Sequence, residues 1–391
     1  MKPYDAFQGV YVHTPFCVRK CLYCDFPSYA GCPAALQERY VEALCREIRN
    51  PALSYWKKPV APEATVYFGG GTPTVLSARQ LGRVVAALKE AGWWRHPAEA
   101  TIEANPGTVD PAKLQALREL GFDRLSLGVQ SFQDGELQAI GRIHTASQAV
   151  QALQWAKEAG FRRLSVDLMY GLPGQTRDSF HQSLDQALSL GLEHISAYSL
   201  IVEEGTPLER LVREGRTTLP DDDATGAMYD DVTHILATAG LARYEVSNYA
   251  VPGQESRHNE VYWHYLPYAA FGAAACGFDG SLRKTNTAGV EGYVRAMEEG
   301  QAGTVWQIEE LPPATRLEEA VFMGLRTTRG VSLADLDERF GTNVSSIYKK
   351  EMGDLTRKGM VEIRQGRMRL TPFGMRYGNE AFEAFIRTGE D

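Results

Sequence analysis

Apolar, β-branched runs alternate with amphipathic stretches along the first 200 residues. Six apolar runs are predicted to form strands, and they cover residues 10–14, 65–69, 100–104, 124–129, 164–170 and 194–200. Helical periodicity covers the stretches between them, at residues 34–48, 77–91, 110–120, 146–159 and 177–190. The repeat of roughly 30 residues is the size of a βα unit. The pattern therefore predicts an α/β fold with a parallel sheet covered by helices. Six units are too few for a closed eight-unit barrel and indicate an open, partial TIM-like (βα)6 barrel.

Polar and glycine-rich segments follow five of these runs. They cover residues 17–24, 69–74, 103–106, 130–132 and 167–174. In parallel α/β proteins, ligands bind at the carboxyl ends of the strands. The five segments are therefore predicted to meet at one site.

The alternation of strands and helices stops near residue 205. After a linker at 220–223, a helix is expected over 224–239, and 240–300 is expected to be loop-rich and aromatic. Helices over 332–340 and 344–358, a hairpin of 360–364 and 368–371 turning at Gly366, and a last helix follow the order of a winged helix. We therefore expect a barrel over 1–205, a barrel extension with a loop-rich segment over 206–312 and a helix-rich, winged-helix-like domain over 313–391.

Composition narrows the class of protein. Basic residues number 41 and acidic residues 49, and the net charge of −8 argues against a main role in coating nucleic acid or an anionic membrane. Residues 349–376 hold eight basic and three acidic side chains, a pattern that a DNA-binding regulator could also show. This local charge is modest against the net charge of −8, so we do not expect a nucleic-acid partner. Apolar stretches are too short to span a bilayer and no secretory signal is visible, so we expect a cytoplasmic protein.

Three of the six cysteines, Cys17, Cys21 and Cys24, lie within eight residues. In a reducing cytosol, such spacing is more typical of metal or cluster ligands than of disulfides. A four-iron cluster needs one ligand per iron, so three thiolates leave one iron open to a small molecule. A zinc site completed by His13 is the alternative.

Residues 11–26, which read YVHTPFCVRKCLYCDF, resemble the cluster loop of the radical S-adenosylmethionine (SAM) enzymes. The motifs GGGTPT at 69–74, EANP at 103–106, SFQ at 131–133 and DLMYGLPGQT at 167–176 follow in the same order as in the branch of oxygen-independent coproporphyrinogen oxidase and its relatives. The resemblance spans the whole barrel. It implies a [4Fe-4S] cluster on Cys17, Cys21 and Cys24, with SAM on the open iron.

The same resemblance implies how SAM is bound and used. In the family the cluster donates one electron, a carbon–sulfur bond of SAM breaks and a 5′-deoxyadenosyl radical forms. Gly70, Gly71 and Thr72 match the positions that meet the methionine amino group, and Arg142 matches the residue that pairs with the methionine carboxylate. Glu103, Gln130 and Asp167 match polar contacts to SAM, and Tyr11 and Tyr23 match aromatic neighbours of the ligand.

Two features distinguish branches within this family. The coproporphyrinogen oxidases carry a fourth cysteine where this chain has Phe26, and residues 258–263 form an intact HNxxYW motif, which marks the HemW-type haem chaperones. Imidazole is a good axial ligand for haem iron, and aromatic rings offer flat faces to a porphyrin. The resemblance thus implies haem binding through His258, Tyr262 and Trp263, whereas a histidine bonded inside an aromatic core is the alternative.

The resemblance also implies partners and competing functions. A haem chaperone would bind haem and pass it to apoproteins such as respiratory haem enzymes, with membrane contact only through those recipients. The main alternative is oxidative decarboxylation of coproporphyrinogen III, followed by another radical SAM reaction on a tetrapyrrole. This chain departs from the family at one position that could belong to the haem-binding loop. The family usually has a histidine there, whereas this chain has Cys276. Catalytic SAM cleavage and the oligomeric state stay open at this point.

Overall fold

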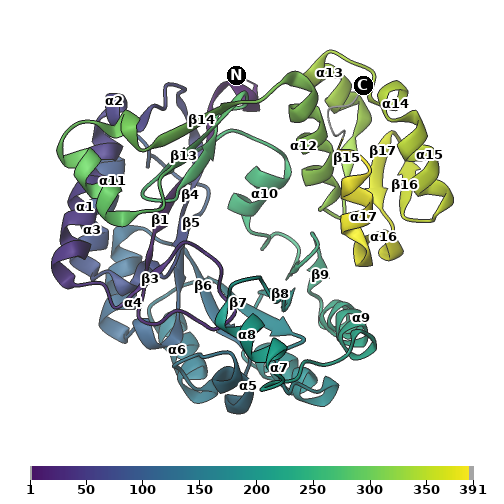
Figure 1. Cartoon of the computed structure of the whole chain (residues 1–391), viewed down its shortest axis with the longest axis horizontal. Helices are drawn as coiled ribbons and strands as arrows, with labels where there is room; N and C mark the ends of the chain where they lie inside the picture. Colours follow the sequence, from purple (N-terminus) through teal and green to yellow (C-terminus); the bar gives the residue numbers. More distant parts are fainter. Residues whose placement is uncertain (1, 387–391) are drawn as a thin grey trace.

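The computed structural model describes residues 2–386. The six expected strands form parallel neighbours, in the order β1 (Phe7–Thr14), β4 (Val60–Gly70), β5 (Ala100–Ala104), β6 (Arg124–Gln130), β7 (Arg163–Tyr170) and β8 (His194–Ser199). The intervening helices lie around their outer face and are α1 (Ala34–Arg49), α3 (Ala78–Glu90), α4 (Pro111–Leu120), α6 (Ala146–Glu158) and α7 (Arg177–Ser189) (Figure 1). The predicted open barrel of βα units is confirmed.

The barrel strands are buried on both faces because helices cover one face and the barrel interior lies against the other. Apolar side chains face the helices, whereas polar ones such as Thr65, Arg124 and Ser165 are buried on the strands as well. In β6, all residues but the last are buried. Glycine follows the ends of several of these helices. Helix α4, for example, is capped at its start by Asp110, whose side chain accepts a hydrogen bond from the Lys113 N–H, and is followed by Gly121, whose φ of 111° favours glycine.

The sheet extends past these six strands on both sides. Strand β11 (Tyr268–Phe271) pairs in parallel with β1, and β12 (Cys276–Phe278), β13 (Leu282–Asn286) and β14 (Trp306–Glu310) continue antiparallel from it. On the other side, β10 (Asn248–Ala250) and β9 (Ala242–Arg243) follow β8 antiparallel. The segment 240–300 was expected to be loop-rich; it instead forms these strands except β14, together with α10 (Arg257–Trp263) and α11 (Val290–Glu298).

A buried ion pair fixes this extension to the barrel. Glu47 of α1 is fully buried and accepts hydrogen bonds from the Gly272 N–H at 2.8 Å and the Tyr293 hydroxyl at 2.7 Å. Its other oxygen accepts from Lys284 Nζ and Asn286 Nδ2, both at 2.9 Å. All four donors come from the segment after residue 270, so this carboxylate holds the added strands against α1.

Residues beyond 310 form a compact module beside the barrel (Figure 1). Its helices surround a small sheet of order β15–β17–β16 and share a second apolar core. The expected helix over 344–358 is divided at Tyr348, and residues 387–391 lie outside the described part. The elements are α12 (Pro313–Leu325), β15 (Val331–Ser332), α13 (Leu333–Phe340), α14 (Val344–Ile347), α15 (Lys349–Arg357), β16 (Val361–Arg364), β17 (Arg367–Leu370), α16 (Pro372–Arg376) and α17 (Gly378–Glu383).

Shorter elements connect these parts. A small two-stranded sheet forms at the cysteine loop, and two helices lie between β8 and β9. No helix within residues 2–386 is long and apolar enough to cross a bilayer. The remaining elements are β2 (Phe16–Cys17), β3 (Tyr29–Ala30), α2 (Pro51–Ser54), α5 (Asp134–Ala139), α8 (Pro207–Arg213) and α9 (Asp222–Thr238).

Candidate functional site

A cavity of about 450 Å³ opens at the carboxyl ends of the barrel strands. The five segments that follow the apolar runs all contribute to its lining, as the sequence pattern predicts. The structure brings together the predicted residues Cys17, Cys21, Tyr23, Cys24, Gly70, Gly71, Thr72, Glu103, Gln130, Arg142 and Asp167.

The three cysteines lie on the loop that leaves β1 and are partly buried. Cys21 Sγ accepts a hydrogen bond from Arg142 Nη1 at 3.3 Å, and Cys17 Sγ lies 3.7 Å from Thr72 Oγ1. Burial raises the pKa of the Cys24 thiol. Within residues 2–386, no group of three or more His, Cys, Asp or Glu side chains is close enough together to hold a single metal ion.

The glycine loop after β4 lies directly against the cysteine loop. The Gly71 N–H donates to the Thr14 carbonyl at 2.8 Å, and the Thr72 N–H donates to the Phe16 carbonyl at 2.8 Å. A Cβ atom on Gly71 would stand 2.7 Å from the Phe16 oxygen and 3.1 Å from Cys17 Sγ. Only glycine permits this approach, and three thiols beside such a cradle fit a cluster held by three cysteines.

Glu103 gives the cavity an acidic wall. Its carboxylate accepts hydrogen bonds from the Tyr67 hydroxyl at 2.6 Å and the Gly70 N–H at 3.2 Å. Burial, with a contribution from the neighbouring Asp167, raises the pKa of Glu103 to about 7. Burial also raises the pKa of Asp167. Both carboxyl groups would ionise more readily beside a cation, and SAM supplies an ammonium and a sulfonium.

Arg142 supplies the matching positive group. Its Nη2 donates to Asn105 Oδ1 at 2.6 Å and also to the Gly128 carbonyl, while its buried Nε has no hydrogen-bond partner in the described structure. An unused guanidinium N–H fits a ligand carboxylate. Asn105 and Gly128 were missed as site residues, although Asn105 belongs to the EANP motif. Gln130, at the end of β6, has a φ of 72°, a strained value for a residue with a side chain.

Tyr11 does not line the cavity. Its hydroxyl lies 3.0 Å from His13 Nδ1, and its ring stacks on Tyr67 with centroids 6.2 Å apart. Tyr11 therefore belongs to a layer inside the barrel, beneath the cavity. Burial lowers the pKa of His13 to about 4, so the imidazole is neutral there.

The HNxxYW motif lies on α10, which packs against the amino-terminal half of the barrel interior, away from the cavity. His258 is 0% exposed, with Nδ1 2.7 Å from Thr65 Oγ1 and Nε2 2.7 Å from the Tyr262 hydroxyl. Its ring stacks on Tyr67 at 5.0 Å, and burial lowers its pKa to about 3. Trp263 is partly buried beneath the Arg326 guanidinium at 4.6 Å. Both nitrogens of His258 are thus engaged within the protein.

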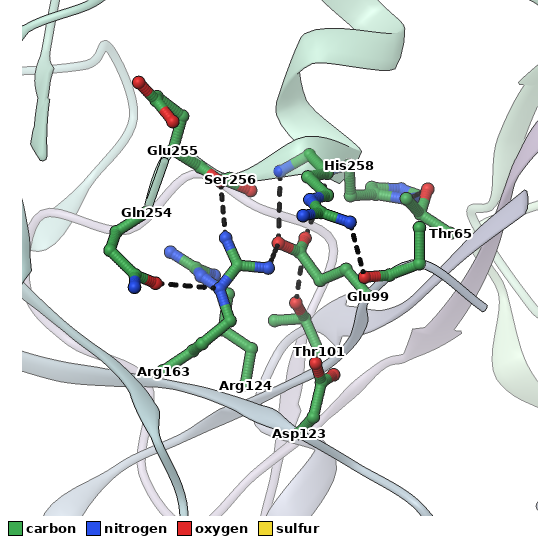
Figure 2. Close-up of polar contacts among 12 residues, drawn as sticks. Thr65, Glu99, Thr101, Asp123, Arg124, Arg163, Gln254, Glu255, Ser256 and His258 are labelled. Carbon is green, nitrogen blue, oxygen red and sulfur yellow. Dashed lines mark hydrogen bonds and ion pairs between the residues drawn. The ribbon is translucent and has the colours of Figure 1, made fainter. Parts of the chain in front are cut away.

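A buried carboxylate holds the start of α10. Glu99, which is fully buried and precedes β5, accepts hydrogen bonds from the N–H groups of Arg257 and His258, both at 3.1 Å. Figure 2 shows this carboxylate between His258 and Arg163. Glu99 also pairs with Arg163 Nη1 at 2.6 Å. Burial alone would raise the pKa of Glu99, but Arg124, Arg163 and the two N–H groups lower it. This constellation was not predicted, because its members are scattered along the chain.

Comparison with known proteins identifies the family. The model of the radical SAM superfamily matches residues 11–187, and that of the HemN C-terminal domain matches residues 311–377. The heme chaperone HemW of Bacillus subtilis (strain 168) is 37% identical over 383 residues, which cover 97% of this chain and 99% of the relative. The chain belongs to the HemW family. As a radical SAM protein it is implied to bind a [4Fe-4S] cluster and SAM.

Other members of the HemW family and one solved structure agree. Escherichia coli (strain K12) HemW is 35% identical, covering 73% of this chain and 75% of the relative. The mitochondrial radical S-adenosyl methionine domain-containing protein 1 of Bos taurus is 34% identical, covering 84% and 70%. The E. coli coproporphyrinogen III oxidase HemN superposes with a TM-score of 0.82 over 98% of this chain and 90% of that one, and at 21% identity it shows the fold alone.

The structure places two further positions that the resemblance singled out. Phe26, where the resemblance to the oxidases would imply a fourth cysteine, is 64% exposed and lines the cavity. Cys276, where the resemblance implies a histidine, lies in β12, and its Sγ accepts a hydrogen bond from Thr285 Oγ1 at 3.2 Å. Burial raises the pKa of the Cys276 thiol, which favours the neutral form.

Proposed function

We propose that this chain is a cytoplasmic haem chaperone that binds haem, carries a [4Fe-4S] cluster and SAM, and delivers haem to apoproteins such as respiratory haem enzymes. The observation that supports it best is the 37% identity to a heme chaperone across 97% of the chain. The intact HNxxYW motif, which lies on α10, agrees with this proposal.

In this proposal, the chain's own residues position SAM at the cluster. When bound, the cluster supplies an electron to the sulfonium. The Arg142 guanidinium binds the methionine carboxylate, and Gly70, Gly71 and Thr72 meet the methionine amino group. Cys17, Cys21 and Cys24 hold the cluster. Polar and aromatic contacts to SAM come from Glu103, Gln130, Asp167 and Tyr23, whereas Tyr11 lies beneath the cavity and does not line it.

Haem binding in this proposal involves His258, Tyr262 and Trp263. Because both imidazole nitrogens of His258 are bonded within the protein, ligation of iron by His258 requires α10 to shift. The rings of Tyr262 and Trp263 then supply apolar faces to the porphyrin. We infer that haem binding is coupled to movement of α10.

The test is an anaerobic haem titration of the reconstituted protein, followed by absorption spectroscopy. Saturable binding and transfer of haem to an apo form of a respiratory haem enzyme are expected. Failure of the wild-type protein to bind haem would refute the proposal. Reconstitution that yields stoichiometric zinc without iron or sulfide would refute the cluster.

Variants then locate the haem site. We expect His258→Ala and the Tyr262→Ala/Trp263→Ala double variant to weaken haem binding. Leu184→Ala, which removes a fully buried side chain of α7 away from the motif, controls for lost stability. Equal losses of haem in the control and motif variants would remove the motif from the haem site.

The competing enzymatic function is tested separately. Reconstituted protein with SAM, a reductant and coproporphyrinogen III should give no protoporphyrinogen under anaerobic conditions. Formation of that product would replace the chaperone proposal with an oxidase.

A further inference from the structure

A second pocket, of about 660 Å³, opens on the barrel surface at the opposite end of the strands from the cysteine cavity. It lies between the C-terminal end of α6, the start of β7 and the turn before α10. Figure 2 shows part of its wall, where Arg163 contacts Gln254 and Glu255 beside the first residues of α10. None of the predicted site residues lines it.

This pocket is strongly basic although the chain carries a net charge of −8. Asp123 is the acidic side chain of its lining, and the Ala100 N–H donates to it at 2.6 Å. The basic side chains of the lining are Arg118, Lys157, Arg162, Arg163 and Arg257.

Helix stabilisation accounts for some of these charges. Lys157 donates to the Leu190 carbonyl at the end of α7, and Arg118 donates to the Phe122 carbonyl after α4. Cations at helix C-termini interact favourably with the helix dipole. Arg163 is likewise engaged, since it pairs with the buried Glu99.

Arg162 and Arg257 are not explained in this way. Arg162 is exposed and makes no hydrogen bond or ion pair within the described part of the chain, and it lies at no helix end. Arg257 is exposed and begins α10, where acidic rather than basic residues are favoured. Only its Nη1 is engaged, with the Ala98 carbonyl at 3.1 Å. Two guanidinium groups therefore present unused N–H donors to the same pocket.

We propose that this pocket binds a ligand that carries closely spaced oxyanions, with Arg162 and Arg257 as its principal contacts. Guanidinium groups bind carboxylates and phosphates in a bidentate manner. Two sources share this chemistry, the paired propionates of haem and a free phosphate or pyrophosphate. Because Arg257 directly precedes His258, the propionate source would place the porphyrin edge beside the HNxxYW motif. That source rests on the proposed haem function, whereas the phosphate source does not.

The test compares an Arg162→Ala/Arg257→Ala double variant with an Arg79→Ala/Arg357→Ala control, which removes the same charge from exposed positions on α3 and α15. Each protein is titrated with haem, with haem dimethyl ester, and with pyrophosphate by calorimetry. Thermal melts of both variants check folding. The single variant Arg162→Glu reverses the charge at an exposed position and is titrated with the same ligands.

Propionate binding predicts that the double variant loses about tenfold in haem affinity, with no change for the dimethyl ester and none in the control. Phosphate binding predicts that the wild type binds pyrophosphate and the double variant does not, with haem affinity unchanged. Two outcomes would overturn the pocket assignment. In the first, haem and pyrophosphate each bind the double variant and Arg162→Glu as tightly as they bind the wild type. In the second, pyrophosphate does not bind the wild type and the double variant keeps the wild-type affinity for haem. If wild-type protein fails to bind haem, the haem function fails, and the pyrophosphate titration alone decides the pocket.

Discussion

Replacing His258 by alanine tests the position of the HNxxYW motif in the fold. The imidazole is fully buried, stacks on Tyr67, and contacts the hydroxyls of Thr65 and Tyr262 at 2.7 Å each. The variant therefore leaves a cavity inside the barrel and two buried hydroxyls without their partner. Removing a buried aromatic side chain costs about 3–5 kcal/mol, and an unsatisfied buried hydroxyl adds to that cost. We expect the free energy of unfolding to fall by at least about 3 kcal/mol.

Urea unfolding of the cluster-free protein under reducing conditions measures this loss. Tyr262→Phe is the matched variant, because it keeps the ring and removes only the hydroxyl bonded to His258, and it should cost about 1–2 kcal/mol. A loss below about 1 kcal/mol for His258→Ala would show that the imidazole is not held inside the barrel. In that case the described setting of α10 would be wrong.

The pH dependence of unfolding gives a second measurement on the same residue. Burial lowers the pKa of His258 to about 3, so between about pH 6.5 and that value the unfolded chain binds a proton here that the folded chain does not. The contribution of His258 to stability therefore falls as the pH falls through this range. His258 contributes about 2 kcal/mol of that fall by about pH 5, and His258→Ala should lose this contribution.

Three further perturbations address the cavity and the sheet extension. Gly71→Ala should lower the iron bound per chain after reconstitution, because its Cβ would stand 2.7 Å from the Phe16 oxygen. Gly107→Ala, whose Cβ would have no atom within 4 Å, should bind as much iron as the wild type. Equal iron in the two variants would refute the need for glycine at position 71. Burial raises the pKa of Glu103 to about 7, so the contribution of this residue to stability should fall as the pH rises from about 4.5 to 7. Urea melts of the wild type and of Glu103→Gln across that range should differ by this contribution, and identical pH slopes would contradict it. Lys284→Met leaves the buried Glu47 carboxylate without its cation and should cost about 3–5 kcal/mol. Adding Glu47→Gln should restore part of that loss, and no restoration would contradict the buried pair.

The βα repeat was predictable because its signals are local. Each of the six runs appears as a strand within about five residues of its predicted bounds, and α4 (Pro111–Leu120) matches the helical periodicity predicted over 110–120. Strand β11 was missed because its four residues lack alternation, and its pairing with β1 joins segments about 260 residues apart. The helix over 344–358 divides at Tyr348, a break that its continuous amphipathic pattern did not reveal.

Part of the candidate site could likewise be predicted from local sequence, and part could not. The segments around the cavity follow consecutive parallel strands, so their convergence could be predicted from chain order alone. The setting of His258 could not, because its partners Thr65, Tyr67 and Glu99 lie on or beside strands about 160 residues or more earlier in the chain. Arg162 and Arg257 likewise share a pocket only through tertiary structure.

A series of contacts inside the barrel connects the cysteine cavity with α10. Glu103, on the wall of the cysteine cavity, accepts a hydrogen bond from Tyr67, whose ring stacks on His258, and His258 contacts Tyr262 of α10. A shift of α10 that frees His258 for iron must break this stack and alter the setting of Tyr67. That change reaches the carboxylate that also accepts from the Gly70 N–H. If His258 ligates haem iron, we therefore expect haem to change the affinity of the cavity for a cation, and thermodynamic linkage would then require the cation to change the affinity for haem by the same factor. Equal affinities for SAM with and without haem would contradict this coupling.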